Sequence, residues 1–254
     1  MKTKKIYFIV LPILFSAFFG FSQNADEIMR KHYDLKESDD MKSQITMILI
    51  DKNNSRKSRK IISYSREGNE GRDSFIEFLE PADVAGSKFL TIAHKKVDDE
   101  QRLYLPSIKK TRKIASSGKD GKFMGSDLFF YDLEDRDFED HSYRFIKNDN
   151  YDGKECFVIE STAKDPNAPY SKTLLWVSKE DYFVYKNEAY DKKVGNLWKI
   201  SVFLDVRNIS GVLVAHKMVI DNRKDNHKTL ISYDNVKINI GIPNNIFTVQ
   251  NLEK

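Results

Sequence analysis

The sequence predicts a mainly β protein (α+β) whose strands form a single large curled antiparallel sheet covered by short helices. From Lys42 to Ile238, apolar and polar residues alternate with period two in many short runs, which is typical of half-buried strands. Turn-forming pairs such as Asp152-Gly153 and Ser210-Gly211 separate these runs at short intervals, as in an antiparallel meander. A sheet of this many strands cannot stay flat, because the twist between neighbouring strands curls it.

The first 22 residues read as a signal peptide. Lys2, Lys4 and Lys5 form a positive n-region, and 6–19 is an apolar core too short for a comfortable membrane span. Gly20 and Ser22 supply small residues, so we expect cleavage between Ser22 and Gln23 and a periplasmic mature protein. The alternative is an uncleaved membrane anchor. No cysteine follows the apolar core, so lipidation through a lipobox is not expected.

Charge and cysteine content restrict the function further. The net charge is +4, and removal of the three leader lysines leaves +1, so no strong basic field for nucleic acid remains. The single cysteine, Cys156, cannot form an internal disulfide and is expected as a buried small hydrophobe. The 23–254 region contains no linker or fixed repeat, which favours one domain.

The elements follow in order. A helix is predicted over 24–35, with Asn24 as its cap, Asp26 and Glu27 in its first turn, and an apolar stripe that includes Ile28 and Met29. Strands are predicted after it at 42–51, 57–66, 74–79, 88–94, 100–105, 109–115, 143–148, 155–163, 172–178, 183–190, 197–206, 212–221 and 228–238.

The alternation in 197–206 puts Trp198, Ile200 and Val202 on an apolar face and Lys199 and Ser201 on a wetter one. The predicted helices are too few to fill the concave side of a curled sheet, so an apolar ligand cavity is one outcome. A sheet curled tightly enough for its own side chains to fill it is the other.

A loop with two bulky apolar residues, Phe123 and Met124, lies between glycines in 121–127. It is interpreted either as a flap beside the mouth of a cleft or as core at the end of the sheet. The preceding basic cluster (Lys109, Lys110, Arg112 and Lys113) suits a solvated edge strand, or a rim that meets lipid head groups or an acidic partner.

Enzymatic motifs are not evident. The sequence contains no GxSxG, HExxH or P-loop pattern, and the SxxK match at Ser107–Lys110 lacks its partner motifs. The turn Asn148–Gly153 does not fit a calcium loop, and the histidines lack metal-ligand spacing. We therefore expect no enzymatic activity, no cofactor and no metal.

Three segments carry a resemblance to a known family. They are FLEPADVAGSKFL at 78–90, LYLPSIKKTRKIASS at 103–117 and FMGSDLFFYDL at 123–133. Together they resemble the outer-membrane lipoprotein-sorting protein family, which is LolA-like and belongs to the lipoprotein carrier and localisation factor superfamily. The resemblance extends over most of the chain after the leader, and it implies a half-barrel.

The family implies a periplasmic carrier or chaperone that binds lipid or lipoprotein acyl chains in an apolar cleft for transfer between envelope membranes. Its partners would be an inner-membrane transporter and an outer-membrane acceptor. The alternative is a non-transporting envelope sensor or scaffold of the same fold, accessory to an exporter of the resistance-nodulation-division type. The residues expected to contact lipid are Met47, Leu49, Phe78, Leu90, Ile92, Leu103, Leu105, Phe123, Met124 and Trp198.

Overall fold

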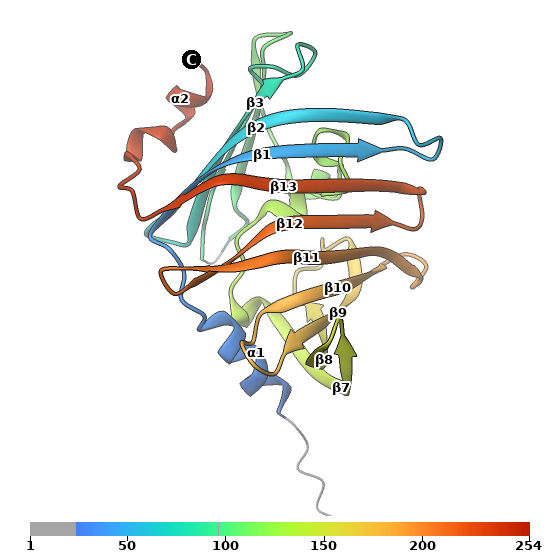
Figure 1. Ribbon diagram of the computed structural model, residues 1–254. Coiled ribbons are helices and arrows are strands. Elements are labelled where there is room, and N and C mark those ends of the chain that lie inside the picture. The colour runs from blue at the N-terminus through green and yellow to red at the C-terminus, as the bar shows by residue number, and fades with distance from the viewer. Residues whose placement is uncertain (1–23, 96) are drawn as a thin grey trace, which may run out of the picture.

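A curled antiparallel sheet of 13 strands dominates the computed structural model, which describes residues 24–95 and 97–254 (Figure 1). The first half of the chain contains α1 (Ala25–Tyr33), β1 (Asp40–Ile50), β2 (Arg56–Glu67), β3 (Arg72–Glu80), β4 (Lys88–Ile92), β5 (Glu100–Leu105) and β6 (Lys110–Lys113). The second half contains β7 (His141–Tyr151), β8 (Lys154–Ala163), β9 (Tyr170–Ser178), β10 (Val184–Asp191), β11 (Leu197–Ile209), β12 (Val212–Asn222), β13 (His227–Ile238) and α2 (Val249–Leu252).

The predicted fold class is confirmed. Each strand predicted from the period-two pattern is present with its ends within three residues of the prediction, and so is the first helix. Asn24 caps that helix as expected, because its side chain accepts a hydrogen bond of 3.1 Å from the Asp26 N–H. The short α2 was not predicted.

The strand order explains how the chain closes its sheet. Strands β1–β6 and β7–β13 form two meanders, and β1 pairs with β13 in the middle, in the order β6-β5-β4-β3-β2-β1-β13-β12-β11-β10-β9-β8-β7. The consecutive strands β6 and β7 therefore lie at opposite edges of the sheet. The connection between them, 114–140, has to cross from one edge to the other, and it does so over the concave face.

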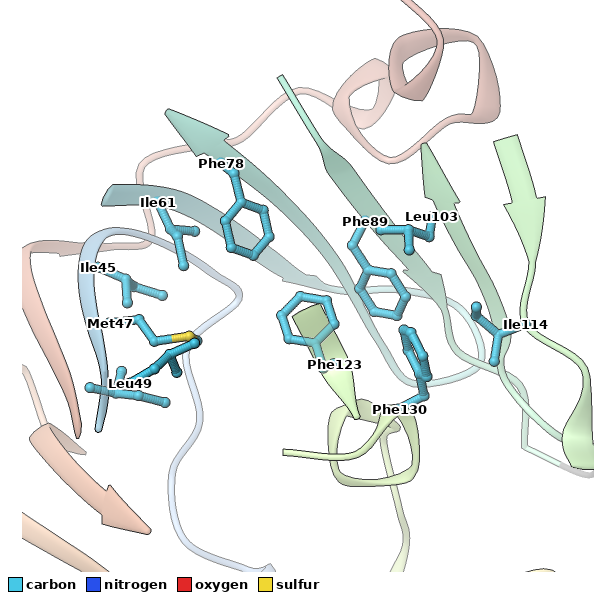
Figure 2. Close-up of a cluster of buried hydrophobic side chains, with 11 residues drawn as sticks. Ile45, Met47, Leu49, Ile61, Phe78, Phe89, Leu103, Ile114, Phe123 and Phe130 are labelled. Carbon is cyan, nitrogen blue, oxygen red and sulfur yellow. The ribbon is translucent and has the colours of Figure 1, made fainter. Parts of the chain in front are cut away.

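Part of this connection fills one half of the concave face. Figure 2 shows Phe123 and Phe130 directed towards side chains of the sheet, with Phe78 and Phe89 closest to them. The ring centroids of Phe123 and Phe89 lie 5.1 Å apart, and those of Phe130 and Phe89 lie 5.6 Å apart. The rest of this buried cluster comes from β1, β2, β5, β13 and the start of the connection: Ile45, Met47, Leu49, Ile61, Leu103, Ile231 and Ile114. We call 123–133 the plug.

The chain reverses tightly at the tip of the plug. Met124 and Gly125 have φ values of 49° and 76°, in the left-handed region that favours glycine. The Arg59 guanidinium of β2 donates a hydrogen bond to the Met124 carbonyl oxygen. This turn directs Phe123, which is 1% exposed, into the core. The structure therefore places Phe123 where the core interpretation had it.

Two other segments cover the sheet. Ile28 and Met29 of α1 pack on Ile159 and Val177 at the β7–β10 end of the concave face. On the opposite, convex face, the C-terminal segment covers β3–β5 with Ile242, Phe247 and Leu252 against Phe75 and Leu90. Figure 1 shows α1 and α2 at these two separate places.

The predicted signal peptide, 1–22, and its cleavage site lie outside the described residues. Within the described ranges, no helix is long and apolar enough to cross a membrane.

The plug predicts a stability difference. Replacing the buried Phe123 by alanine removes a ring from a packed core, so Phe123→Ala should lower the free energy of unfolding by about 3–5 kcal/mol in urea titration. Ile108→Ala provides the control, because Ile108 is 58% exposed and should change stability by less than about 0.5 kcal/mol. Equal, small effects of both substitutions would mean that the plug does not pack as core in solution.

Candidate functional site: a cavity on the concave face

The other half of the concave face is hollow. A cavity of about 600 Å³ lies between the plug, α1 and strands β8–β13. Its apolar lining comes from the sheet, from α1 and from the plug: Leu175, Val184, Phe203, Met218, Ile220, Tyr233, Met29, Leu128 and Leu133. From the sequence, a concave face filled by side chains and a concave face with an open cavity were both possible. In the structure one half of the face is filled and the other half is open.

The ten residues predicted to contact lipid fall into three places, none of which lines this cavity. Leu90 and Ile92 lie under the C-terminal segment on the convex face, and Trp198 packs on Phe129 with ring centroids 5.0 Å apart. The other seven belong to the filled half or pack against it: Met47, Leu49, Phe78, Leu103, Leu105, Phe123 and Met124. Lipid contact at these seven would require the plug to leave the sheet.

The sequence reasoning missed the lining residues for a simple reason. Along β11, Lys199, Ser201 and Phe203 line the cavity, so the alternating Ile200 and Val202 point to the convex face. The more apolar side of this strand therefore faces outwards. A signal was present in β12, where Met218 and Ile220 pair with Phe203 and Ser201.

A buried polar cluster closes one part of the cavity. The Lys199 ammonium lies 2.9 Å from the Tyr170 hydroxyl and 3.4 Å from an Asp132 carboxylate oxygen, and 3.2 Å from the centroid of the Phe129 ring. The Tyr170 hydroxyl donates to Asp132 at 2.9 Å. Burial lowers the pKa of Lys199 and raises that of Tyr170. The cluster joins the plug to β9 and β11.

A second buried cluster fixes the plug to β12 and β13. The Asp127 carboxylate, 0% exposed, accepts hydrogen bonds from Asn222 (2.9 Å), His227 (2.7 Å) and Thr229 (2.7 Å). The Asp127 N–H donates to the Thr229 hydroxyl at 2.9 Å. A carboxylate with this many donors is well compensated for its burial, so the plug is held as a fixed wall of the cavity.

The cavity continues towards α1. A smaller cavity of about 370 Å³ shares His32, Tyr33, Arg136 and Phe183 with it. This second cavity is lined by the segment after α1 and by the turns β2–β3, β9–β10 and β11–β12, which all lie at the same end of the sheet. Burial lowers the pKa of His32, which favours its neutral form at this opening.

Within residues 24–95 and 97–254, no group of three or more His, Cys, Asp or Glu residues could hold a metal ion. Cys156 is fully buried, and burial raises the pKa of its thiol, as expected for a packing residue. In the predicted basic cluster, Lys109, Lys110, Arg112 and Lys113 are exposed at the edge strand β6 and its turn.

Known proteins share this architecture. A family model described as that of an uncharacterized protein matches residues 70–254. An outer membrane lipoprotein-sorting protein domain from Vibrio parahaemolyticus is 29% identical with a TM-score of 0.87, over 91% of this chain and 98% of that one. A DUF1329 family protein from Desulfovibrio piger is 27% identical with a TM-score of 0.84, over 89% and 97%.

A LolA superfamily protein from Nitrosomonas europaea has the same fold, with 22% identity and a TM-score of 0.70 over 89% of this chain and 98% of that one. No curated protein matches the sequence. These proteins and this chain therefore share one fold class, an open half-barrel built from an antiparallel sheet. The chain belongs to the family whose model matches residues 70–254, and it has the LolA-like fold of the outer membrane lipoprotein-sorting protein domain from Vibrio parahaemolyticus.

The buried pair predicts a coupling between Lys199 and Asp132. Lys199→Met should lower the free energy of unfolding by up to about 3 kcal/mol, because it leaves the Asp132 carboxylate, which is only 20% exposed, without its cation. Adding Asp132→Asn, which can still accept from the Phe129 N–H, should restore at least about 1 kcal/mol.

Lys228→Met is the matched control for this pair. Lys228 is 53% exposed and lies 3.8 Å from Asp221, which also pairs with Arg223, so the loss of Lys228 should cost less than about 1 kcal/mol. Additive effects of Lys199→Met and Asp132→Asn would show that the two charges do not interact.

Proposed function

We propose that this protein is a periplasmic carrier or chaperone that binds lipid or lipoprotein acyl chains in the cavity between the plug and β8–β13. Its task would be to shield acyl chains while they cross the aqueous space between envelope membranes. An inner-membrane transporter would supply the cargo and an outer-membrane acceptor would receive it. The protein would act by binding alone, without an enzymatic step.

The observation that carries this proposal is the unfilled, largely apolar half of the concave face. Each methylene moved from water into such a site gains about 0.8 kcal/mol, so even part of an acyl chain would be held usefully. A volume of about 600 Å³ lies within the range of small-molecule sites, roughly 300–1,000 Å³. The family name of the Vibrio relative, lipoprotein sorting, supports the same class of cargo.

We further propose that 1–22 is a signal peptide and that 23–254 is the binding domain. N-terminal sequencing of the protein from the periplasmic fraction should begin at Gln23, because small residues precede this position. Recovery of Met1 in the membrane fraction would contradict this cleavage.

The cavity can be filled by a single substitution. Ser201 is buried and lines the cavity from β11, so Ser201→Phe should occupy the space of an acyl chain. Binding of a long-chain fluorescent fatty acid should then fall by about tenfold or more, which corresponds to about 1.4 kcal/mol. Native mass spectrometry of gently purified protein should likewise find less co-purified lipid.

Ser232→Phe is the matched control. Ser232 follows Ile231 of the concave core in β13, so its side chain points to the convex face, and the substitution should leave fatty-acid binding unchanged. Unaltered binding in Ser201→Phe would exclude this cavity as the site. A wild-type protein without lipid or probe binding would instead favour the scaffold alternative.

A further inference from the structure

The two ends of the central strands carry opposite charge. The connections β1–β2, β10–β11 and β12–β13 lie at one end of the sheet, and Figure 1 shows the ends of β1, β13, β12 and β11 next to one another. We call 51–60, 191–196 and 221–228 the basic rim. It contains ten lysines and arginines and four aspartates: Lys52, Arg56, Lys57, Arg59, Lys60, Lys192, Lys193, Arg223, Lys224 and Lys228, with Asp51, Asp191, Asp221 and Asp225.

The opposite end of the strands is acidic. The segments 34–40 and 67–72 contain six carboxylates against two cations: Asp34, Glu37, Asp39, Asp40, Glu67 and Glu70 with Lys36 and Arg72. The net charge expected for the mature chain is only +1. The separation of positive and negative charge between the two ends of the strands therefore gives the molecule an electric dipole. A polar molecule orients in the field of a charged surface, with its basic rim towards negative charge.

The aspartates of the basic rim are already engaged. Asp191 pairs with Lys224 at 2.7 Å, Asp225 pairs with Lys122 at 2.7 Å, and Asp221 pairs with Arg223 at 2.9 Å. Asp51 accepts hydrogen bonds from two backbone N–H groups of its own turn. Several cations therefore remain available.

Six exposed cations of the rim have no carboxylate within 4.0 Å in the part of the chain that the structure describes: Lys52, Arg56, Lys57, Lys60, Lys192 and Lys193. They are spread over two hairpins and do not converge on one pocket. Such a distribution suits an extended negative surface better than a single anionic ligand.

An apolar residue stands among these charges. Val194, at the tip of the β10–β11 connection, is 63% exposed and follows Lys192 and Lys193 directly. An aliphatic side chain beside lysines is the combination that favours the head-group layer of a bilayer, where the apolar group enters and the cations meet phosphates.

We propose that the basic rim docks on a bilayer surface that carries anionic head groups, with Val194 entering the head-group layer. The cavity continues towards the α1 end, opposite the rim, so docking leaves its opening directed away from the lipid. The rim would thus hold the protein at a membrane while cargo or a partner approaches from the aqueous side. This docking is independent of whether the cavity binds acyl chains.

Flotation with lipid vesicles tests the proposal. The mature protein should bind vesicles of phosphatidylglycerol and phosphatidylethanolamine and not vesicles of phosphatidylcholine, and high salt should release it. The variant Lys52→Ser/Lys57→Ser/Lys192→Ser/Lys193→Ser should bind at least about tenfold more weakly, because each cation near the surface contributes to the attraction.

The control removes the same charge elsewhere. Lys95→Ser/Lys154→Ser/Lys179→Ser/Lys237→Ser removes four cations at the opposite end of the sheet, and it should weaken binding by less than about threefold. Equal weakening by both variants would mean diffuse attraction without a docking rim. Failure of the wild-type protein to bind anionic vesicles would overturn the proposal and leave an acidic protein as the partner of the rim.

Substitution of Val194 gives a second test of the docking surface. Val194→Ser should weaken vesicle binding by about fivefold, through lost burial of its methyl groups, and Val97→Ser should have no effect. Val97 is the matched control because it is 70% exposed and lies in the β4–β5 connection at the opposite end. Identical binding of the two valine variants would remove Val194 from the docking surface.

Discussion

The arrangement of this protein depends on one connection. Because β6 and β7 follow one another in sequence but form opposite edges of the sheet, 114–140 has to span the concave face. The aromatic residues Phe123 and Phe130 use this crossing to fill the half of the face above β1–β5. The same crossing leaves the half above β8–β13 without a filling segment, so the cavity and the core have a common origin.

A cavity of this kind needs a rigid wall, because an apolar hollow in water otherwise collapses or fills with side chains. The plug supplies that wall through buried polar contacts. Asp127 is held by donors from β12 and β13, and Asp132 by Tyr170 and Lys199. Charged pairs are a costly way to gain stability, but their directional contacts fix position. Here they fix the plug between the filled half and the open half.

Much of the fold could be predicted from the sequence, because alternation and turn residues act locally and each strand carries its own pattern. The direction in which each strand faces could not. In β11 the apolar Ile200 and Val202 suggested the inner face, yet Ser201 and Phe203 line the cavity. Which face is inside depends on the plug and on the pairing of β1 with β13, and these contacts are distant in sequence. The resemblance identified the half-barrel, but it could not say which half the plug fills.

The clustered polar side chains around Lys199 in the cavity wall already have hydrogen-bond and ion-pair partners, and this affects how an acyl cargo would lie. The Lys199 ammonium already contacts Tyr170 and Asp132 and lies against the Phe129 ring, so it has little to offer to a head group. A chain that entered head first would leave its polar group among satisfied partners and apolar side chains, at a desolvation cost. A chain that entered tail first would bury methylenes against Phe203, Met218 and Ile220, and would keep its head near the α1 opening. The proposed carrier would therefore hold the tail and present the head of its cargo to the next partner.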